Sequence, residues 1–290
     1  MANVTTIYAC TADGLAVINK PGTLGEWLPP RRVLSGSPAT SVWAEPGPPV
    51  RVLAVQGGSL LLTESGGRNW DAVETEEPVL RLFPGTHERH IYAALNGGAL
   101  LRSEDGGSSW QSLPAAPGDV QSLIEARDLG SFIVAGSELY SGDIGSGTWR
   151  QERAGVTALA MDESTNTLYA AGESGLLKRS AGARGWEAIA GSPAGARVLL
   201  VIPGAVGKPA TLAAGTGEGL WLSPDGGETW HQSEVRDAVS AAARDPERRD
   251  RVYVATEAGV ILESGNRGQQ WAPVNHAPLP AILSFFVLRI

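Results

Sequence analysis

One eight-residue turn sequence recurs along the chain and constrains its fold more than any other feature. Ser103, Asp105, Gly107 and Trp110 define its frame, Ser/Thr-x-Asp-x-Gly-x-x-Trp. The frame returns as Ser223, Asp225, Gly227 and Trp230, and with Asn in place of Asp as Ser264, Asn266, Gly268 and Trp271. Partial copies end at Trp70 and Trp149, and only the tryptophan is kept at Trp27 and Trp186.

The seven tryptophans of this register lie 37 to 44 residues apart, so a repeat of about 41 residues fits almost seven times into 290 residues. The Asp or Asn side chain can accept backbone hydrogen bonds that close a tight turn, and the glycine supplies a positive φ. The tryptophan begins the next strand, and we expect its ring to fill the space between adjacent sheets.

Each repeat contains four short apolar segments separated by Gly, Pro, Asn or Asp. In the third repeat these are residues 79–83, 90–94, 99–102 and 110–113, and they predict four antiparallel strands. Four strands in a unit of this length are typical of a propeller blade. We therefore predict an all-β fold, a single seven-bladed β-propeller domain over residues 1–290 with four antiparallel strands per blade.

The two ends of the chain complete each other in this prediction. The N-terminus opens on a second-strand sequence at residues 6–10, whereas residues 281–288 match an inner strand with no repeat after them. We expect these segments to pair, so that residues 4–32 and 281–290 share the first blade. The pairing closes the ring and hides strand edges that would otherwise be open to aggregation.

The repeated frame resembles the Asp-box, or bacterial neuraminidase repeat, of β-propellers, and the resemblance covers the whole chain. Asp-boxes occur in sialidases, xyloglucan-cleaving enzymes, sortilin-like receptors and photosystem II stability/assembly factor-like proteins, so the motif is specific for fold and not for function. The single ring without an inserted catalytic domain is most similar to the assembly factor-like branch. That resemblance implies a non-catalytic binding or assembly scaffold.

Composition excludes some classes of partner. A net charge of −8 and a pI near 5.1 argue against nucleic acid and anionic membranes, because both require a basic face. No secretory signal and no membrane-length apolar run are present, so we expect a cytoplasmic protein with no membrane partner. We also expect a monomer whose partner is a protein or a carbohydrate. Cys10, the one cysteine, is expected to be a buried thiol.

The sequence predicts no cofactor and no metal site. His87 and His90 form a pair without a nearby ligand set. The segment Gly204-Ala-Val-Gly207-Lys208-Pro209 is two residues short of a phosphate-binding loop and has Pro where Ser or Thr is required, so we interpret it as a loop with a surface lysine. The charged run at residues 244–251 has mixed sign and is expected to be a solvated loop.

Glycoside hydrolysis is the alternative function, and a sugar-binding module without catalysis lies between the two hypotheses. Sialidases need an arginine cluster, an activated tyrosine and acidic partners, and their Phe/Tyr-Arg-Ile-Pro element is absent here. Arg81 and Arg197 occupy inner-strand positions on different blades and could meet near the axis. Acids that could accompany them are Glu77, Asp119, Glu218 and Glu234.

We expect ligands on the axial face built by loops that enter the inner strands and by turns between second and third strands. The inner-strand residues predicted to point toward the axis there are Arg81, Gln121, Thr157, Arg197 and Ser240. The rim residues predicted to add polar contacts are Glu77, Arg153, Glu218, Arg236 and His276. The competing interpretation is that all ten solvate a water-filled channel, and no residue is assigned a catalytic role.

Overall fold

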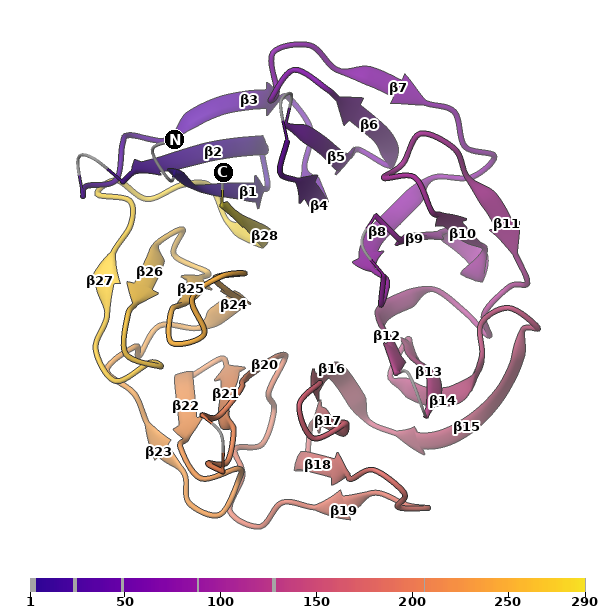
Figure 1. Ribbon diagram of the computed structural model, residues 1–290, viewed down its shortest axis with the longest axis vertical. Coiled ribbons are helices and arrows are strands. Elements are labelled where there is room, and N and C mark those ends of the chain that lie inside the picture. Colours follow the sequence, from indigo (N-terminus) through magenta and orange to yellow (C-terminus); the bar gives the residue numbers. More distant parts are fainter. Residues whose placement is uncertain are drawn as a thin grey trace.

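Seven four-stranded sheets stand around a central axis (Figure 1). The computed structural model describes residues 4–22, 25–47, 50–87, 89–126, 129–205 and 207–289. Within these ranges the one helical element is the three-residue 3-10 turn η1 (Asn96–Gly98). The predicted all-β, seven-bladed propeller is confirmed.

The blades are numbered in chain order, and the strands of each are given from the axis outward. Blade 1 contains β28 (Ile282–Arg289), β1 (Val4–Thr11), β2 (Gly14–Pro21) and β3 (Arg31–Ser35). Blade 2 contains β4 (Ala39–Glu45), β5 (Arg51–Gln56), β6 (Ser59–Thr63) and β7 (Asp71–Val73). Blade 3 contains β8 (Val79–Pro84), β9 (Ile91–Leu95), β10 (Leu100–Ser103) and β11 (Gln111–Leu113). Blade 4 contains β12 (Val120–Ala126), β13 (Gly130–Ala135), β14 (Glu138–Asp143) and β15 (Thr148–Ala154).

The last three blades follow the same order. Blade 5 contains β16 (Val156–Asp162), β17 (Thr167–Gly172), β18 (Gly175–Arg179) and β19 (Glu187–Ala188). Blade 6 contains β20 (Val198–Ile202), β21 (Thr211–Thr216), β22 (Gly219–Ser223) and β23 (His231–Gln232). Blade 7 contains β24 (Val239–Arg244), β25 (Val252–Thr256), β26 (Ile261–Ser264) and β27 (Ala272–Pro273).

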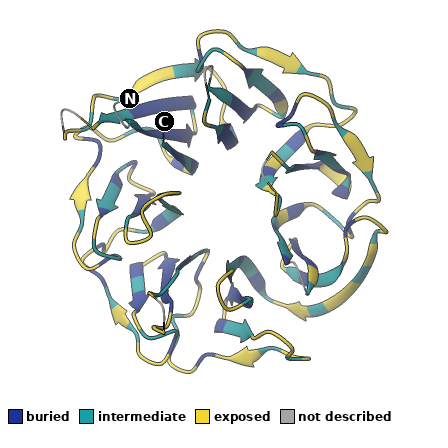
Figure 2. Ribbon diagram, in the orientation of Figure 1, coloured by how far each residue is buried: buried dark blue, intermediate teal, exposed yellow. Residues whose placement is uncertain are grey.

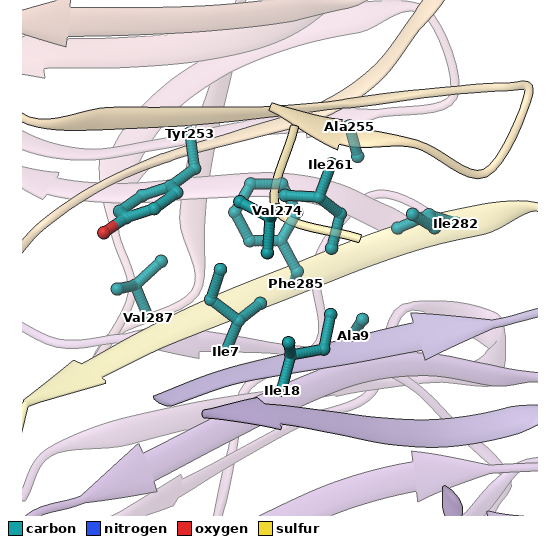
Figure 3. Packing of buried hydrophobic residues seen from close by; sticks show 10 residues of the cluster. All are labelled: Ile7, Ala9, Ile18, Tyr253, Ala255, Ile261, Val274, Ile282, Phe285 and Val287. Carbon is teal, nitrogen blue, oxygen red and sulfur yellow. The ribbon is translucent and has the colours of Figure 1, made fainter. Parts of the chain in front are cut away.

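The C-terminal strand closes the ring by pairing with the N-terminal one. β28 runs antiparallel to β1, with Arg289 opposite Thr5 and Val287 opposite Ile7. Figure 3 shows Phe285 and Val287 of β28 between Ile7 of β1 and Tyr253 of β25, in the apolar layer that joins blade 7 to blade 1. The predicted pairing of the two ends is confirmed, and the outer strand of this blade extends to residue 35, slightly beyond the predicted boundary.

Seven apolar clusters hold neighbouring blades together, and each contains one tryptophan of the repeat. The tryptophans, in order from the seam between blades 7 and 1, are Trp27, Trp70, Trp110, Trp149, Trp186, Trp230 and Trp271. In Figure 2 the second strands of the blades are largely buried, the innermost strands are mixed and the outer strands are largely exposed. The expected role of the tryptophan, filling the space between adjacent sheets, is therefore observed at every seam.

The repeated turns connect the third and fourth strands of their blades, at the periphery. Ser103 Oγ accepts a hydrogen bond from Gly107 N at 2.7 Å, and Asp105 Oδ1 accepts bonds from Ser108 N and Ser109 N, both at 2.9 Å. The partial copy in blade 2 keeps the pattern without Asp, because Ser65 Oγ accepts a bond from Asn69 N at 2.9 Å. These bonds close the turns locally; the Gly107 donor is buried, and those of Ser108, Ser109 and Asn69 lie at the exposed periphery.

Candidate functional site

A cavity of about 790 Å³ opens at one end of the ring axis. Its walls are residues of five inner strands and of the loops that follow two of these strands. The lining residues are Pro84, Gly85, Thr86, Leu123, Ile124, Glu125, Leu159, Ala160, Met161, Glu163, Asn166, Leu199, Leu200, Val201 and Arg244. They come from blades 3 to 7: from the middle of β12, β16 and β20, from the ends of β8 and β24, and from the loops after β8 and β16.

The cavity combines an apolar wall with a few charged groups. Ile124, Met161 and Leu200 are half-buried residues of the wall. Glu163 is an exposed carboxylate in the loop between β16 and β17, and Arg244 is a half-buried cation at the end of β24. The exposed lining is divided about equally between apolar and polar surface, so the cavity can accept both apolar and hydrogen-bonding groups.

Glu125 is the carboxylate most tightly held in the cavity. Its Oε2 atom accepts hydrogen bonds from the Tyr92 hydroxyl at 3.1 Å and from Thr86 Oγ1 at 3.2 Å. Burial, together with the nearby Glu125 charge, raises the pKa of Tyr92 to about 12. Tyr92 therefore remains a protonated donor near neutral pH, which is the opposite of an activated tyrosine nucleophile.

The ring is tied more closely on its other side, along blades 1 to 3. Ser284 Oγ donates to Thr40 O at 3.0 Å, and Thr40 Oγ1 donates to Leu80 O at 3.0 Å. Ser41 Oγ also accepts a bond from Leu82 N at 3.0 Å. These bonds join the inner strands of three successive blades directly, and of these three it is blade 3 that contributes lining residues to the cavity.

None of the ten site residues predicted from the sequence lines this cavity. Gln121, Thr157 and Ser240 lie near the opposite ends of their inner strands, at β-bulges where the ladder skips one residue. The Thr157 hydroxyl is already engaged with Ala196 O at 2.6 Å. Arg197 directly precedes β20, whose ladder is regular.

Arg81 is one residue out of step with these positions, because the bulge of β8 falls on Leu80. Arg81 is an exposed residue, but neighbouring protein atoms displace part of the water around its guanidinium. This desolvation lowers the pKa of the guanidinium below its ordinary value. Arg81 and Arg197 belong to blades 3 and 6, and no hydrogen bond or ion pair joins them in the described ranges.

The predicted rim residues are exposed and lie away from the cavity. Arg236 Nη1 donates to Gln232 Oε1, and Arg153 lies in β15 opposite Leu139. Glu77, Glu218 and His276 lie in turns or loops. Ligand binding by these residues is not tested by this geometry, and the ten residues remain a proposal.

Two of the acids proposed as partners for Arg81 and Arg197 instead accept hydrogen bonds from backbone N–H groups. Asp119 Oδ1 accepts a hydrogen bond from Gly97 N at 2.7 Å, and Glu234 Oε1 accepts one from Trp271 N at 2.7 Å. The carboxylates that do share a cavity, Glu125 and Glu163, were missed. In the sequence, Glu125 lies near the end of an inner-strand segment and Glu163 follows another. These positions correspond to the end of the axis opposite to the one where the sequence predicts the site.

The charged run at residues 244–251 forms the loop between β24 and β25, as expected, but its ends are not solvated. Arg244 lines the cavity, and Asp245 is buried with Oδ1 accepting bonds from Glu247 N and Arg248 N, both at 2.9 Å. Arg251 forms an ion pair with Glu263 at 2.7 Å. A run of mixed charge in the sequence does not show whether its side chains bind other protein groups, as Asp245 and Arg251 do, or face solvent.

The histidine pair does not belong to a larger cluster of metal-binding groups. The rings of His87 and His90 lie edge to face, 5.0 Å apart, and in the described part of the chain no three His, Cys, Asp or Glu residues gather as a metal site would require. Cys10 is fully buried, as expected, and burial raises the pKa of its thiol to about 12. Within the same residues, no helix has the length and apolar character to cross a membrane.

Solved structures with similar folds place this chain among known propellers. YCF48 from Cyanidioschyzon merolae superposes with a TM-score of 0.60 at 16% identity, over 82% of this chain and 85% of that chain. A structure described as YCF48 bound to D1 peptide gives 0.63 at 19% identity, over 85% of each chain. A "putative 6-phosphogluconolactonase" from Bacteroides uniformis gives 0.65 at 12% identity, over 99% of this chain and 100% of that chain.

The chain resembles photosystem II assembly-factor propellers in its fold. No family model and no curated protein matches the sequence. At identities of this size the likeness extends to the fold alone, since one propeller scaffold hosts many functions. The function of this chain therefore depends on the residues of the cavity and its surroundings.

Proposed function

We propose that the protein is a non-catalytic scaffold that binds a segment of a partner protein at the cavity end of the ring axis. The observation that carries the proposal is the 790 Å³ cavity, which is large enough for side chains of a partner and offers apolar and polar surface in about equal measure. A propeller of similar fold has been solved with a bound peptide, which supports a peptide as the class of ligand.

The proposal is tested by pull-down experiments with two variants, one that changes the cavity end of the axis and one that changes the opposite end. Leu200→Arg places a charge in the apolar wall, and Gln121→Arg places the same charge at the opposite end of the axis. We expect a partner that wild type and Gln121→Arg both retain in crosslinking pull-downs and that Leu200→Arg loses at an unchanged melting temperature. A partner lost only with Gln121→Arg would instead favour the predicted ten-residue site.

A carbohydrate-directed function is the second candidate, because Glu125 and Glu163 line the same cavity. Paired carboxylates are the groups that glycoside hydrolysis requires. The raised pKa of Tyr92 and the single arginine among the lining residues argue against a sialidase-type mechanism. Turnover of 4-nitrophenyl glycosides that is lost in Glu125→Gln/Glu163→Gln would support hydrolysis, whereas glycan binding without turnover would support a sugar-binding module.

We further propose that the chain is an Asp-box propeller and that it works in the cytoplasm as a monomer. The hydrogen bonds of Asp105 and Asp225 in their turns support the first point. Size-exclusion chromatography with light scattering tests the monomer, and fractionation of cells that express the native gene tests the location.

A further inference from the structure

A second pocket lies away from the axis, between blades 6 and 7, and its charge is unusual for this protein. It has a volume of about 400 Å³ and is lined by Gly204, Ala205, Lys208, Pro209, Thr211, Leu222, Pro224, His231, Arg267 and Gln269. Two permanent cations and a histidine line it, and no carboxylate is among these lining residues. The chain as a whole carries a net charge of −8, so this concentration of positive groups runs against its composition.

Arg267 is anchored in this pocket by neutral oxygen atoms. It donates from Nη1 to Pro203 O at 2.8 Å, from Nη2 to Ile202 O at 2.9 Å and from Nη2 to Thr211 Oγ1 at 3.1 Å. Burial lowers the pKa of its guanidinium, and the charge of Asp250 opposes that shift from a distance beyond ion pairing. The carbonyl groups satisfy the hydrogen-bond donors of the guanidinium, but no described carboxylate lies within ion-pairing distance of its positive charge.

Two other arginines that bind turn carbonyls show what is missing. Arg51 and Arg89 each donate to Asp105 O at 2.8 Å in the turn of blade 3. Arg51 is also paired with Glu64, and Arg89 with Glu45 at 3.1 Å. No described carboxylate forms an ion pair with Arg267, so the arginine at the pocket is the exception.

The backbone of Arg267 is also strained, with φ of 63°. The same turn position is glycine in the other full copies of the repeat, Gly106 and Gly226, whose φ values of 72° and 76° are typical of glycine. A non-glycine residue held in this region is strained, and such strain often occurs at functional positions. Arg267 therefore stands where the two sister turns have glycine.

We propose that this pocket binds the phosphate group of a phosphate monoester, with Lys208, His231 and Arg267 facing the oxyanion. Pro209, Pro224 and Leu222 provide an apolar wall for the organic part of the ligand. The volume of about 400 Å³ lies within the range of small-molecule sites. Lys208 belongs to the glycine-containing segment that lacks the spacing of a phosphate-binding loop. The proposed site therefore depends on side chains and not on the backbone of that segment.

Calorimetric titration with inorganic phosphate and phenyl phosphate tests the site, in a phosphate-free buffer at constant ionic strength. We expect both to bind wild type, and phenyl phosphate more tightly because of the apolar wall. Lys208→Gln/His231→Gln alters two exposed side chains without disturbing the fold, and it should weaken phenyl phosphate binding at least about tenfold.

A second variant, Arg267→Gly, tests the strained residue itself. Glycine is the residue found at this position of the sister turns, so the change should relieve the backbone strain and preserve the turn. It also removes the bonds to Ile202, Pro203 and Thr211, so we expect a lower melting temperature. At a temperature where circular dichroism shows this variant folded, we expect phenyl phosphate binding to be abolished.

The control variant is Arg68→Gln/Arg184→Gln, which removes two exposed positive charges from blades 2 and 5. It should bind phenyl phosphate as wild type does, because it removes two permanent positive charges, more than the single one that each pocket variant removes, while the pocket is intact. The proposal is overturned if wild type binds neither compound, if the pocket variants bind as tightly as the control, or if phenyl phosphate binds no better than inorganic phosphate.

Discussion

At the scale of single residues, the repeated turns show how one side chain can fix a loop. Asp225 Oδ1 accepts a hydrogen bond from Thr229 N at 2.9 Å, and Ser223 Oγ accepts one from Gly227 N at 2.7 Å. In blade 7, Asn266 Oδ1 accepts the equivalent bond from Gln270 N at 2.9 Å. Asp and Asn at the third position of the repeated turn therefore both supply the acceptor oxygen that the turn needs.

Replacing that acceptor should cost stability without affecting the axis. Asp105→Ala removes the partners of Ser108 N and Ser109 N, and we expect the free energy of unfolding to fall by about 1 to 2 kcal/mol. Asp105→Asn, which copies the natural residue of blade 7, should lose less. Urea denaturation of the three proteins measures this, and equal stability of Asp105→Ala and wild type would contradict it.

The same carboxylates should make stability depend on acid pH. Hydrogen bonds from Thr229 lower the pKa of Asp225 to about 2; at Asp105, burial works against ionisation, but bonds from Ser109, Ser103 and Ser108 outweigh it and hold the pKa at about 2. A lowered folded-state pKa stabilises the fold above the unfolded value, about 4, and that stabilisation is lost as the pH falls toward 2. Melting temperatures from pH 5 to 2 should fall more steeply for wild type than for Asp225→Asn.

At the scale of elements, the sequence predicts strands well and their irregularities poorly. Trp110 and Gly107 indicate the turn and the seam, because local chemistry and a large apolar ring determine both. The bulge at Leu80 has no such signal, and it shifts Arg81 out of step with Gln121. The position of the cavity along the axis depends on how side chains from five blades pack together. The sequence of a single repeat does not determine that packing.

The seam between blades 7 and 1 has a charged centre at Glu263. Its carboxylate pairs with Lys20 at 2.9 Å and Arg251 at 2.7 Å, and it accepts a bond from Trp27 Nε1 at 2.9 Å. Burial alone would raise the pKa of Glu263, but these donors outweigh it and the pKa lies below its ordinary value. The group is therefore ionised at neutral pH.

Neutralising this carboxylate should weaken the seam. Glu263→Gln leaves Lys20 and Arg251 without a counterion in a half-buried site, and we expect a loss of about 1 to 3 kcal/mol in the free energy of unfolding. The exposed Glu257→Gln on the same blade is the control and should be close to neutral. If chemical denaturation gives the same midpoint for both variants, the cluster does not stabilise the seam.

At the scale of the whole molecule, closure is what turns seven similar sheets into one ring. Every seam contains a tryptophan of the repeat, but blade 1 alone is built from both ends of the chain. Without β28, β1 would present an unpaired edge, and the apolar layer shown in Figure 3 would lose Phe285 and Val287. Closure should therefore contribute to stability far beyond the length of one strand.

Deletion of residues 281–290 tests this directly. The loss of the buried side chains of Ile282, Phe285, Val287 and Leu288 should lower the free energy of unfolding by several kcal/mol, on the order of two or more large apolar residues, and should promote aggregation through the β1 edge. Leu283→Ala, at the bulged and 41% exposed position of the same strand, is the matched control and should melt near wild type. Thermal melting and light scattering measure both effects, and a truncated chain that melts with wild type as a monodisperse species would show that the ring holds without its closing strand.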